Sequence, residues 1–142
     1  MVDNIEISRK IRILIIDDDK DFCNFIKKNL QLLGNYKVII AKGGNMGMWF
    51  SQCHWHKPDL ILLDIMMPGM DGYEILRRLK KDNKTVLIPI IMLTAKGDIS
   101  SKIKAEGFYC DDYLTKPVET TVLMSAIEKV LAKRGIMVSR LK

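Results

Sequence analysis

DLILLDIMMPGMDG, residues 59–72, is the stretch that decides the fold. Its apolar run, Leu60 to Leu63, is typical of a strand buried on both faces of a parallel sheet. The run ends in a single carboxylate, Asp64, and Pro68 and Gly72 then mark a loop. Open α/β sheets place their chemistry at the carboxyl ends of strands. Asp64 is therefore either a functional acid or the cap of a turn, and this stretch alone leaves both readings open.

The residues after this stretch predict a helix. Asp71 and Glu74 have the spacing of a capping box, in which each side chain satisfies a free backbone N–H at a helix start. The helix is predicted over Tyr73 to Lys81.

The composition is that of one soluble domain. The chain has 142 residues, of which 48% are hydrophobic and 28% charged, as in ordinary globular proteins. The sequence has neither an apolar run of membrane-spanning length nor a signal-peptide core, so we expect a cytoplasmic protein without a membrane segment. Three scattered cysteines, Cys23, Cys53 and Cys110, predict reduced thiols.

The net charge of +6 is mild. Lysines and arginines are spread over predicted helix faces instead of forming a basic block with interleaved aromatics. Solvated helix faces account for them, so direct nucleic-acid binding by this chain is not favoured.

Strands and helices alternate along the chain. The other predicted strands are Ile11–Ile16, Tyr36–Ala41, Ile88–Leu93 and Tyr113–Leu114. The other predicted helices are Lys20–Leu33, one that carries Trp49, Phe50 and Cys53, then Asp98–Glu106 and Thr120–Ala132. Five strands alternating with five helices imply an α/β fold, a doubly wound (βα)5 unit of three layers whose parallel five-stranded sheet is covered on both sides.

Two helices have clear apolar faces. The first is predicted to bury Phe22, Phe25, Ile26, Leu30 and Leu33, and the last to bury Val122, Leu123, Ile127, Val130 and Leu131.

Polar side chains follow the predicted strands: Asp17, Asp18, Asp64, Thr94 and Lys116. Because parallel strands end at one edge of a sheet, these side chains should meet. Converging carboxylates need a cation, and hard oxygen ligands suit Mg²⁺. A carboxylate can attack phosphorus when metal, ammonium and hydroxyl groups neutralise the phosphoryl oxygens. Structural alternatives stay open: Asp19 or Asp21 as the cap of the first helix, Thr94 as a strand end, and Lys116 as a solvated lysine.

The segments ILIIDDD, LLDIMMPGMDG, IIMLTA and DDYLTKP together resemble the receiver domain of two-component response regulators, which are CheY-like proteins. The resemblance covers residues 11–134, leaving residues 1–10 as a lead-in and 135–142 as a tail or the start of a linker. It implies the flavodoxin-like strand order 2-1-3-4-5, a known property of the fold.

The resemblance also implies site roles. Asp64 would be the phospho-acceptor, and Asp17, Asp18, Asp64 and the backbone carbonyl of Met66 would bind Mg²⁺. Lys116 would contact the phosphoryl group, and its bond to Pro117 would be cis.

Switching and rate roles are implied as well. Thr94 and Tyr113 would form the switch pair that changes the surface of the fourth helix, fifth strand and fifth helix. Met66 and Lys96 would tune hydrolysis of the acyl phosphate.

The implied partners are a sensor histidine kinase or a histidine phosphotransfer protein, and an output domain, downstream protein or second copy at the switch surface. The chain departs from the family where Tyr109 and Cys110 replace the usual Gly-Ala, so we expect the loop after the fourth helix, and with it the output surface, to differ. Cys53, His54 and His56 match no zinc spacing, so we do not expect a metal there.

Two other functions fit part of the sequence. Asp17 and Asp19 form a DxD after the first strand, as in phosphatases of the haloacid dehalogenase type, with Asp17 as nucleophile. Alternatively, the chain is a binding module that is never phosphorylated. Since all five site residues of the receiver pattern are present, the sequence favours the receiver, a signalling protein rather than an enzyme.

Overall fold

The computed structural model describes residues 5–6, 9–43, 45, 57–67, 69, 71–95 and 110–138. Several predictions lie outside the described residues: the second helix, with Cys53, His54 and His56, the fourth helix, and Lys96, Tyr109 and Pro68.

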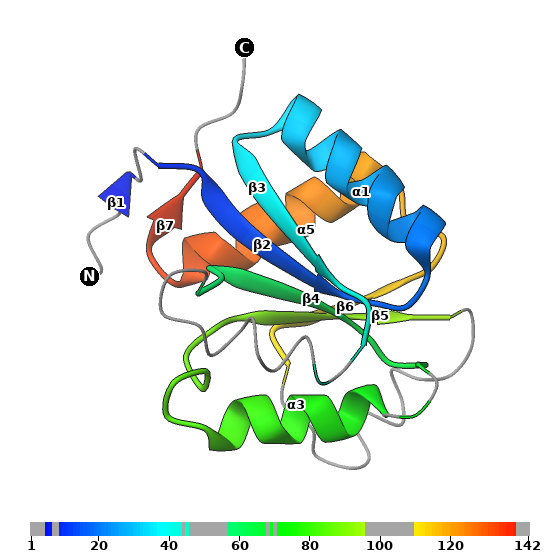
Figure 1. The fold of residues 1–142 in the computed structure, drawn as a ribbon. Helices are drawn as coiled ribbons and strands as arrows, with labels where there is room; N and C mark the ends of the chain where they lie inside the picture. The colour runs from blue at the N-terminus through cyan, green and yellow to red at the C-terminus, as the bar shows by residue number, and fades with distance from the viewer. Residues whose placement is uncertain are drawn as a thin grey trace.

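Five parallel strands form the central sheet (Figure 1). They are β2 (Ile11–Ile16), β3 (Tyr36–Ala41), β4 (Leu60–Asp64), β5 (Ile90–Thr94) and β6 (Asp112–Thr115). Their order is β3-β2-β4-β5-β6, and each neighbouring pair is parallel. Counting only these strands along the chain, the order is 2-1-3-4-5, which confirms the predicted doubly wound fold.

Some strand ends differ from the prediction. Strand β5 begins at Ile90 rather than Ile88 and includes Thr94, since Pro89 before it has no N–H for a ladder bond. Asp64 is the last residue of β4, at the carboxyl end of that strand. The side chains of Asp64 and Thr94 therefore leave from the strands themselves.

Helices cover both faces of the sheet. Helices α1 (Lys20–Leu33) and α5 (Thr120–Lys133) lie on one face, and α3 (Gly72–Lys81) lies on the other (Figure 1). Alternate residues of β2 feed the two cores: Ile13 and Ile15 belong to the cluster with α1 and α5, and Leu14 and Ile16 to the cluster with α3. This alternation is the two-residue period of a strand buried on both sides.

The predicted buried faces of α1 and α5 were wrong in part. Phe25 and Leu33 are 57% and 48% exposed, and Val122 is 48% exposed, whereas Cys23 and Met124 are buried. The apolar stripe of each helix is wider than the strip that the sheet covers, so its outer positions remain in solvent. Other core predictions, including Ile26, hold.

Helix caps also differ from the prediction. Asp71 caps α3 by accepting from the N–H of Tyr73 at 2.9 Å, but Glu74 pairs with Arg77 and Arg78 and does not close a capping box. Gly34 ends α1 with extended backbone, and a side chain there would collide with the ring of Tyr36. Close packing, and not a left-handed turn, therefore requires the glycine.

The lead-in and the tail contact one another. Strand β1 (Ile5–Glu6) pairs in parallel with β7 (Ile136–Met137), which follows a left-handed Gly135. Two-residue strands are too short to produce a sequence pattern, so this pairing was not predicted.

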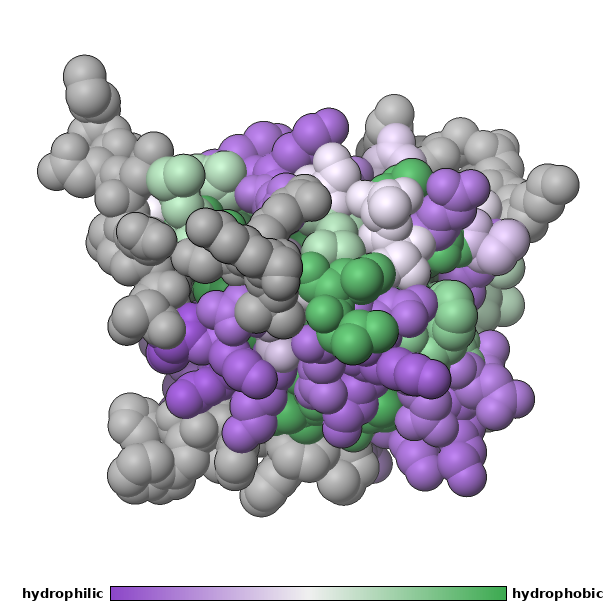
Figure 2. Space-filling view, turned by 90° about the horizontal axis from the view of Figure 1, so that it is seen from above, coloured by the Kyte–Doolittle hydropathy of each residue, from purple (hydrophilic) through white to green (hydrophobic). Residues whose placement is uncertain are grey.

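The surface in Figure 2 is mixed, with hydrophilic residues around a small apolar patch. Among the described helices, none combines the length and apolar character needed to cross a membrane.

Candidate functional site

The sheet brings the predicted residues to one edge. Asp17 follows β2 directly, Asp64 ends β4, Thr94 ends β5, and Lys116 follows β6. Pairing of Asp64 with Leu93 and of Thr94 with Thr115 aligns the strand ends. A contact between Asp17 and Lys116, 99 residues apart, is possible only because of this topology.

Three carboxylates form an acidic cluster there. One oxygen from each of Asp17, Asp18 and Asp64 can be chosen so that all three lie within 4.8 Å of one another. Asp17 and Asp64 are buried, while Asp18 is exposed and leaves the cluster open to solvent. A few carboxylates with room for water are the ligands that Mg²⁺ prefers, so the residues fit a hard divalent cation.

Lys116 provides the positive charge of the site. Its Nζ lies 2.6 Å from Asp17 Oδ2 and 3.8 Å from Asp64 Oδ1. The predicted cis peptide between Lys116 and Pro117 is present. The ammonium is therefore held at Asp17, within reach of Asp64.

Burial and charge perturb the acids and thiols around this cluster. Burial and the neighbouring charge of Asp17 raise the pKa of Asp64 to about 6, although Lys116 opposes the shift. Beneath the cluster, burial raises the pKa of Cys23 to about 12, so this thiol stays protonated. Ionising Asp64 is thus costly mainly because the carboxyl is buried, and the charge of Asp17 adds to that cost.

The loop beside Asp64 is fixed by close backbone contacts. A Cβ on Gly72 would overlap the carbonyl oxygen of Asp64 and the Cα of Ile65, and Gly72 donates its N–H to Ile65 at 3.0 Å. Gly69 has φ of 80°, which favours glycine. The start of α3 is thus packed directly on the end of β4.

Met66 lies at the edge of the site. Its N–H donates to Asp64 Oδ1 at 3.4 Å, and its side chain is exposed. The Met66 backbone therefore lies next to the Asp64 carboxylate, where the predicted carbonyl ligand to a metal would be needed.

The predicted switch residues lie on neighbouring strands. Thr94 is buried, and its hydroxyl donates to the carbonyl of Leu114 at 3.4 Å. Tyr113 pairs with Met92 across β5 and β6 and packs half-buried against the core cluster on the α3 side. Thr94 pairs with Thr115, so the two predicted switch residues lie two ladder positions apart.

Two sequence interpretations can now be judged. Asp19 is the N-cap of α1, since its carboxylate accepts from the N–H of Phe22 at 3.1 Å. The second acid of the DxD thus serves as a helix cap, as the structural alternative anticipated.

Phe22, predicted only as a core residue, has its ring centroid 4.2 Å from Lys116 Nζ. A contact over 94 residues of sequence has no local signal that could have revealed it.

The chain is similar to proteins of known family. The model of the response regulator receiver domain matches residues 13–128. Relatives include the phosphate regulon transcriptional regulatory protein PhoB of Pseudomonas aeruginosa, 43% identical over 87% of this chain and 52% of that protein. The DNA-binding dual master transcriptional regulator RpaA of Synechocystis is 39% identical over 86% of this chain and 49% of that protein.

Protein PilH of Pseudomonas aeruginosa is 37% identical, over 85% of this chain and 98% of its own length. The chain spans about half the length of PhoB and RpaA. Among solved structures, a response regulator from Chloroflexus aurantiacus matches with a TM-score of 0.78 and 33% identity, covering 87% of this chain and 99% of that one. The chain belongs to the receiver domain family of two-component response regulators.

Proposed function

We propose that Asp64 accepts a phosphoryl group from the phosphohistidine of a sensor histidine kinase or a histidine phosphotransfer protein. The observation that carries this proposal is the buried Asp64 carboxylate with Lys116 Nζ 3.8 Å away and two further carboxylates beside it. The protein acts as a signalling module that assists its own phosphorylation and dephosphorylation, in the cytoplasm where such a kinase presents its phosphohistidine.

The reaction is a displacement at phosphorus. A carboxylate oxygen of Asp64 forms the new O–P bond as the P–N bond of the donor breaks, and the imidazole nitrogen leaves with the electron pair. Lys116 stabilises the charge on the phosphoryl oxygens from its position beside Asp64, and the Thr94 hydroxyl donates to another oxygen. Because only the carboxylate attacks, the reaction needs Asp64 ionised.

Mg²⁺ would be held by Asp17, Asp18, Asp64 and the backbone carbonyl of Met66. Bound there, it would neutralise phosphoryl oxygens that the carboxylates would otherwise repel. The three carboxylates support this assignment, since their oxygens lie within 4.8 Å of one another and repel unless a cation lies among them.

The phosphoryl group would switch the output surface. Thr94 moves toward the phosphoryl oxygen and Tyr113 rotates inward, which biases one of two surface states. Lys96 and the exposed Met66 side chain would tune how fast the acyl phosphate hydrolyses.

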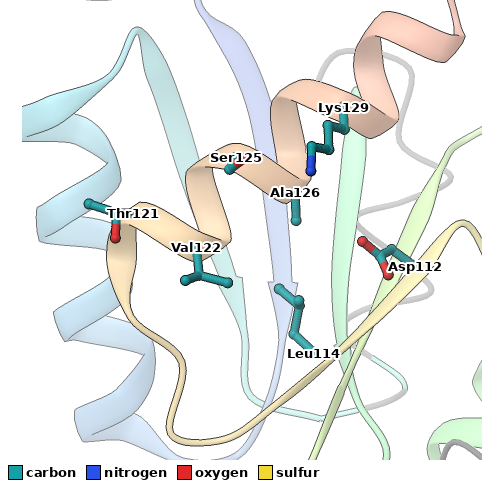
Figure 3. Close-up of a pocket in the computed structure, with 7 residues that line it drawn as sticks. All are labelled: Asp112, Leu114, Thr121, Val122, Ser125, Ala126 and Lys129. Carbon is teal, nitrogen blue, oxygen red and sulfur yellow. The ribbon is translucent and has the colours of Figure 1, made fainter.

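The described part of the output surface is a groove of about 320 Å³ between β6 and α5 (Figure 3). Leu114 of β6 faces Val122 and Ala126 of α5 across it, with Asp112 and Lys129 at one end. An output domain, a downstream protein or a second copy would bind there. PhoB and RpaA are both regulators of transcription, which supports an output domain in a longer protein.

Incubation with Mg²⁺ and acetyl phosphate tests the proposal. We expect one labile phosphoryl group per chain by intact mass, absent in Asp64→Asn and retained in Asp21→Asn. Asp21 is an exposed acid in the first turn of α1 and gives a matched loss of charge. An unmodified wild-type protein that is folded, or an Asp64→Asn variant that is modified equally, would contradict it.

A further inference from the structure

Three neighbours among the described residues hold the ammonium of Lys116. Two are the carboxylates of Asp17 and Asp64, and the third is the Phe22 ring, whose centroid lies 4.2 Å from Nζ. The face of an aromatic ring carries partial negative charge and attracts a cation at this distance. The lysine is only 20% exposed, so the attraction is weakly screened by water.

The Phe22 ring is itself held in place. Phe22 lies in the first turn of α1, where its N–H donates to the Asp19 cap at 3.1 Å. Its half-buried side chain packs against the core cluster on the α1 and α5 side. Phe22 is therefore fixed by the helix start and by the core.

We propose that Phe22 is a positioning residue for Lys116, whose ring keeps the ammonium next to Asp64 during phosphoryl transfer. The inference rests on the proposed function for its kinetic consequence but not for the contact itself. In the resting protein Asp17 is the nearest anion to Lys116. When Asp17 shares its charge with a metal, its hold on Lys116 weakens, and the neutral ring remains as an anchor that does not compete for the metal.

The contact has a spectroscopic signature. Protons on the lysine carbon next to Nζ lie near the ring face, so their resonances should be shifted upfield by the ring current. We expect this shift in the wild type and in Phe22→Tyr, and its loss in Phe22→Leu, which keeps apolar volume without a ring. Phe25→Leu is the matched control, because Phe25 is on the same helix but exposed. This measurement needs no phosphorylation.

The kinetic consequence is measured with acetyl phosphate and saturating Mg²⁺. Phe22→Leu should lower the maximal rate of Asp64 phosphorylation about three- to tenfold, the factor that corresponds to one cation–π contact. Phe22→Tyr should restore the rate, and the half-saturating Mg²⁺ concentration should change less than twofold in both. In a Lys116→Ala background, Phe22→Leu should have no further effect, since the residue acts through Lys116.

An unshifted Lys116 resonance in the wild type overturns the positioning role, as does an equal loss of rate on Phe22→Leu with or without Lys116. A wild-type protein that shows the shift but accepts no phosphoryl group overturns the proposed function, and with it the kinetic half of this inference. The two failures are thereby distinguished.

Discussion

The two edges of the sheet contain the same kinds of residues in different electrostatic arrangements. At the amino edge, carboxylates are matched by donors that surround them. At the carboxyl edge, Asp17 and Asp64 share Lys116 between them. The arrangement at the amino edge holds elements together. The arrangement at the carboxyl edge leaves negative charge that a bound cation can neutralise.

At the amino edge, Asp59 precedes β4 and Asp111 precedes β6. Asp59 accepts both Nη groups of Arg9 at 2.7 Å and the N–H of Arg12 at 2.8 Å. Asp111 accepts the N–H of Ile90 at 2.8 Å and Arg134 Nη2 at 3.0 Å. These bonds join the lead-in and the end of α5 to the starts of the strands.

At the carboxyl edge Asp17 accepts the N–H of Asp19 at 2.9 Å as well as Lys116, but the described residues offer Asp64 fewer donors. Asp64 accepts a 3.4 Å bond from Met66, and the pKa near 6 reflects its burial and the charge of Asp17. Burial of an acid therefore does not by itself identify a functional site. What identifies it is burial without full compensation.

The largest effect should come from removing the shared cation. Lys116→Met leaves the fully buried Asp17 without its ion pair and should lower the free energy of unfolding by about 3 kcal/mol at neutral pH. Urea denaturation measures this, with the exposed Lys20→Met as control. Added Mg²⁺ should recover part of the loss, and unchanged stability would contradict the shared-charge account.

Weakening an ion pair at the amino edge of the sheet should lower the free energy of unfolding slightly less. It should leave phosphorylation of Asp64 intact. Asp111→Asn weakens the bond to Arg134 and should lower the free energy of unfolding by about 2 kcal/mol. The initial rate of phosphorylation by acetyl phosphate should stay within about twofold of the wild type. A rate that falls in proportion to stability would show that the two edges are coupled.

Removing the charge of Asp64 at the carboxyl edge of the sheet should stabilise the folded protein. The folded-state pKa of Asp64 is raised to about 6, so ionisation of this acid opposes folding. In metal-free buffer Asp64→Asn should gain about 2 kcal/mol above pH 6. The gain should shrink as the pH falls through 6 and vanish below about pH 4, where the carboxyl is protonated in both states. A gain that is constant with pH would contradict the assignment.

The smallest effect is expected for the exposed ion pair between Arg9 and Asp59. Arg9 is 46% exposed, so Arg9→Gln should lower the free energy of unfolding by about 0.5 kcal/mol despite the two short bonds. Added salt should reduce the difference between this variant and the wild type. A loss of unfolding free energy several times larger would mean that the β1–β7 pairing depends on this ion pair.

Much of the fold could be predicted from local pattern. Runs such as Ile11–Ile16 and Leu60–Leu63 identify strands buried on both faces, and the carboxylates after them mark the site edge. The strand order and the residue roles came from the family resemblance. The order is confirmed by the sheet, while the roles stay predictions.

What the sequence did not reveal depends on distant contacts. Periodicity cannot show where the sheet stops covering a helix, so Phe25 and Val122 were wrongly placed in the core. The pair of Arg134 with Asp111 and the contact of Phe22 with Lys116 join segments far apart along the chain. Such contacts are fixed by the topology of the fold, so they produce no recognisable spacing of residues in the local sequence.

The central claim is that Asp64 carries the phosphoryl group, and locating that group tests it most directly. Borohydride reduces an aspartyl phosphate to homoserine with loss of phosphate, and peptide mass spectrometry then locates the reduced residue. After incubation with acetyl phosphate and Mg²⁺, we predict homoserine at position 64 alone. Homoserine at position 17 or 18 would contradict the account and support the phosphatase-like use of the first acidic cluster.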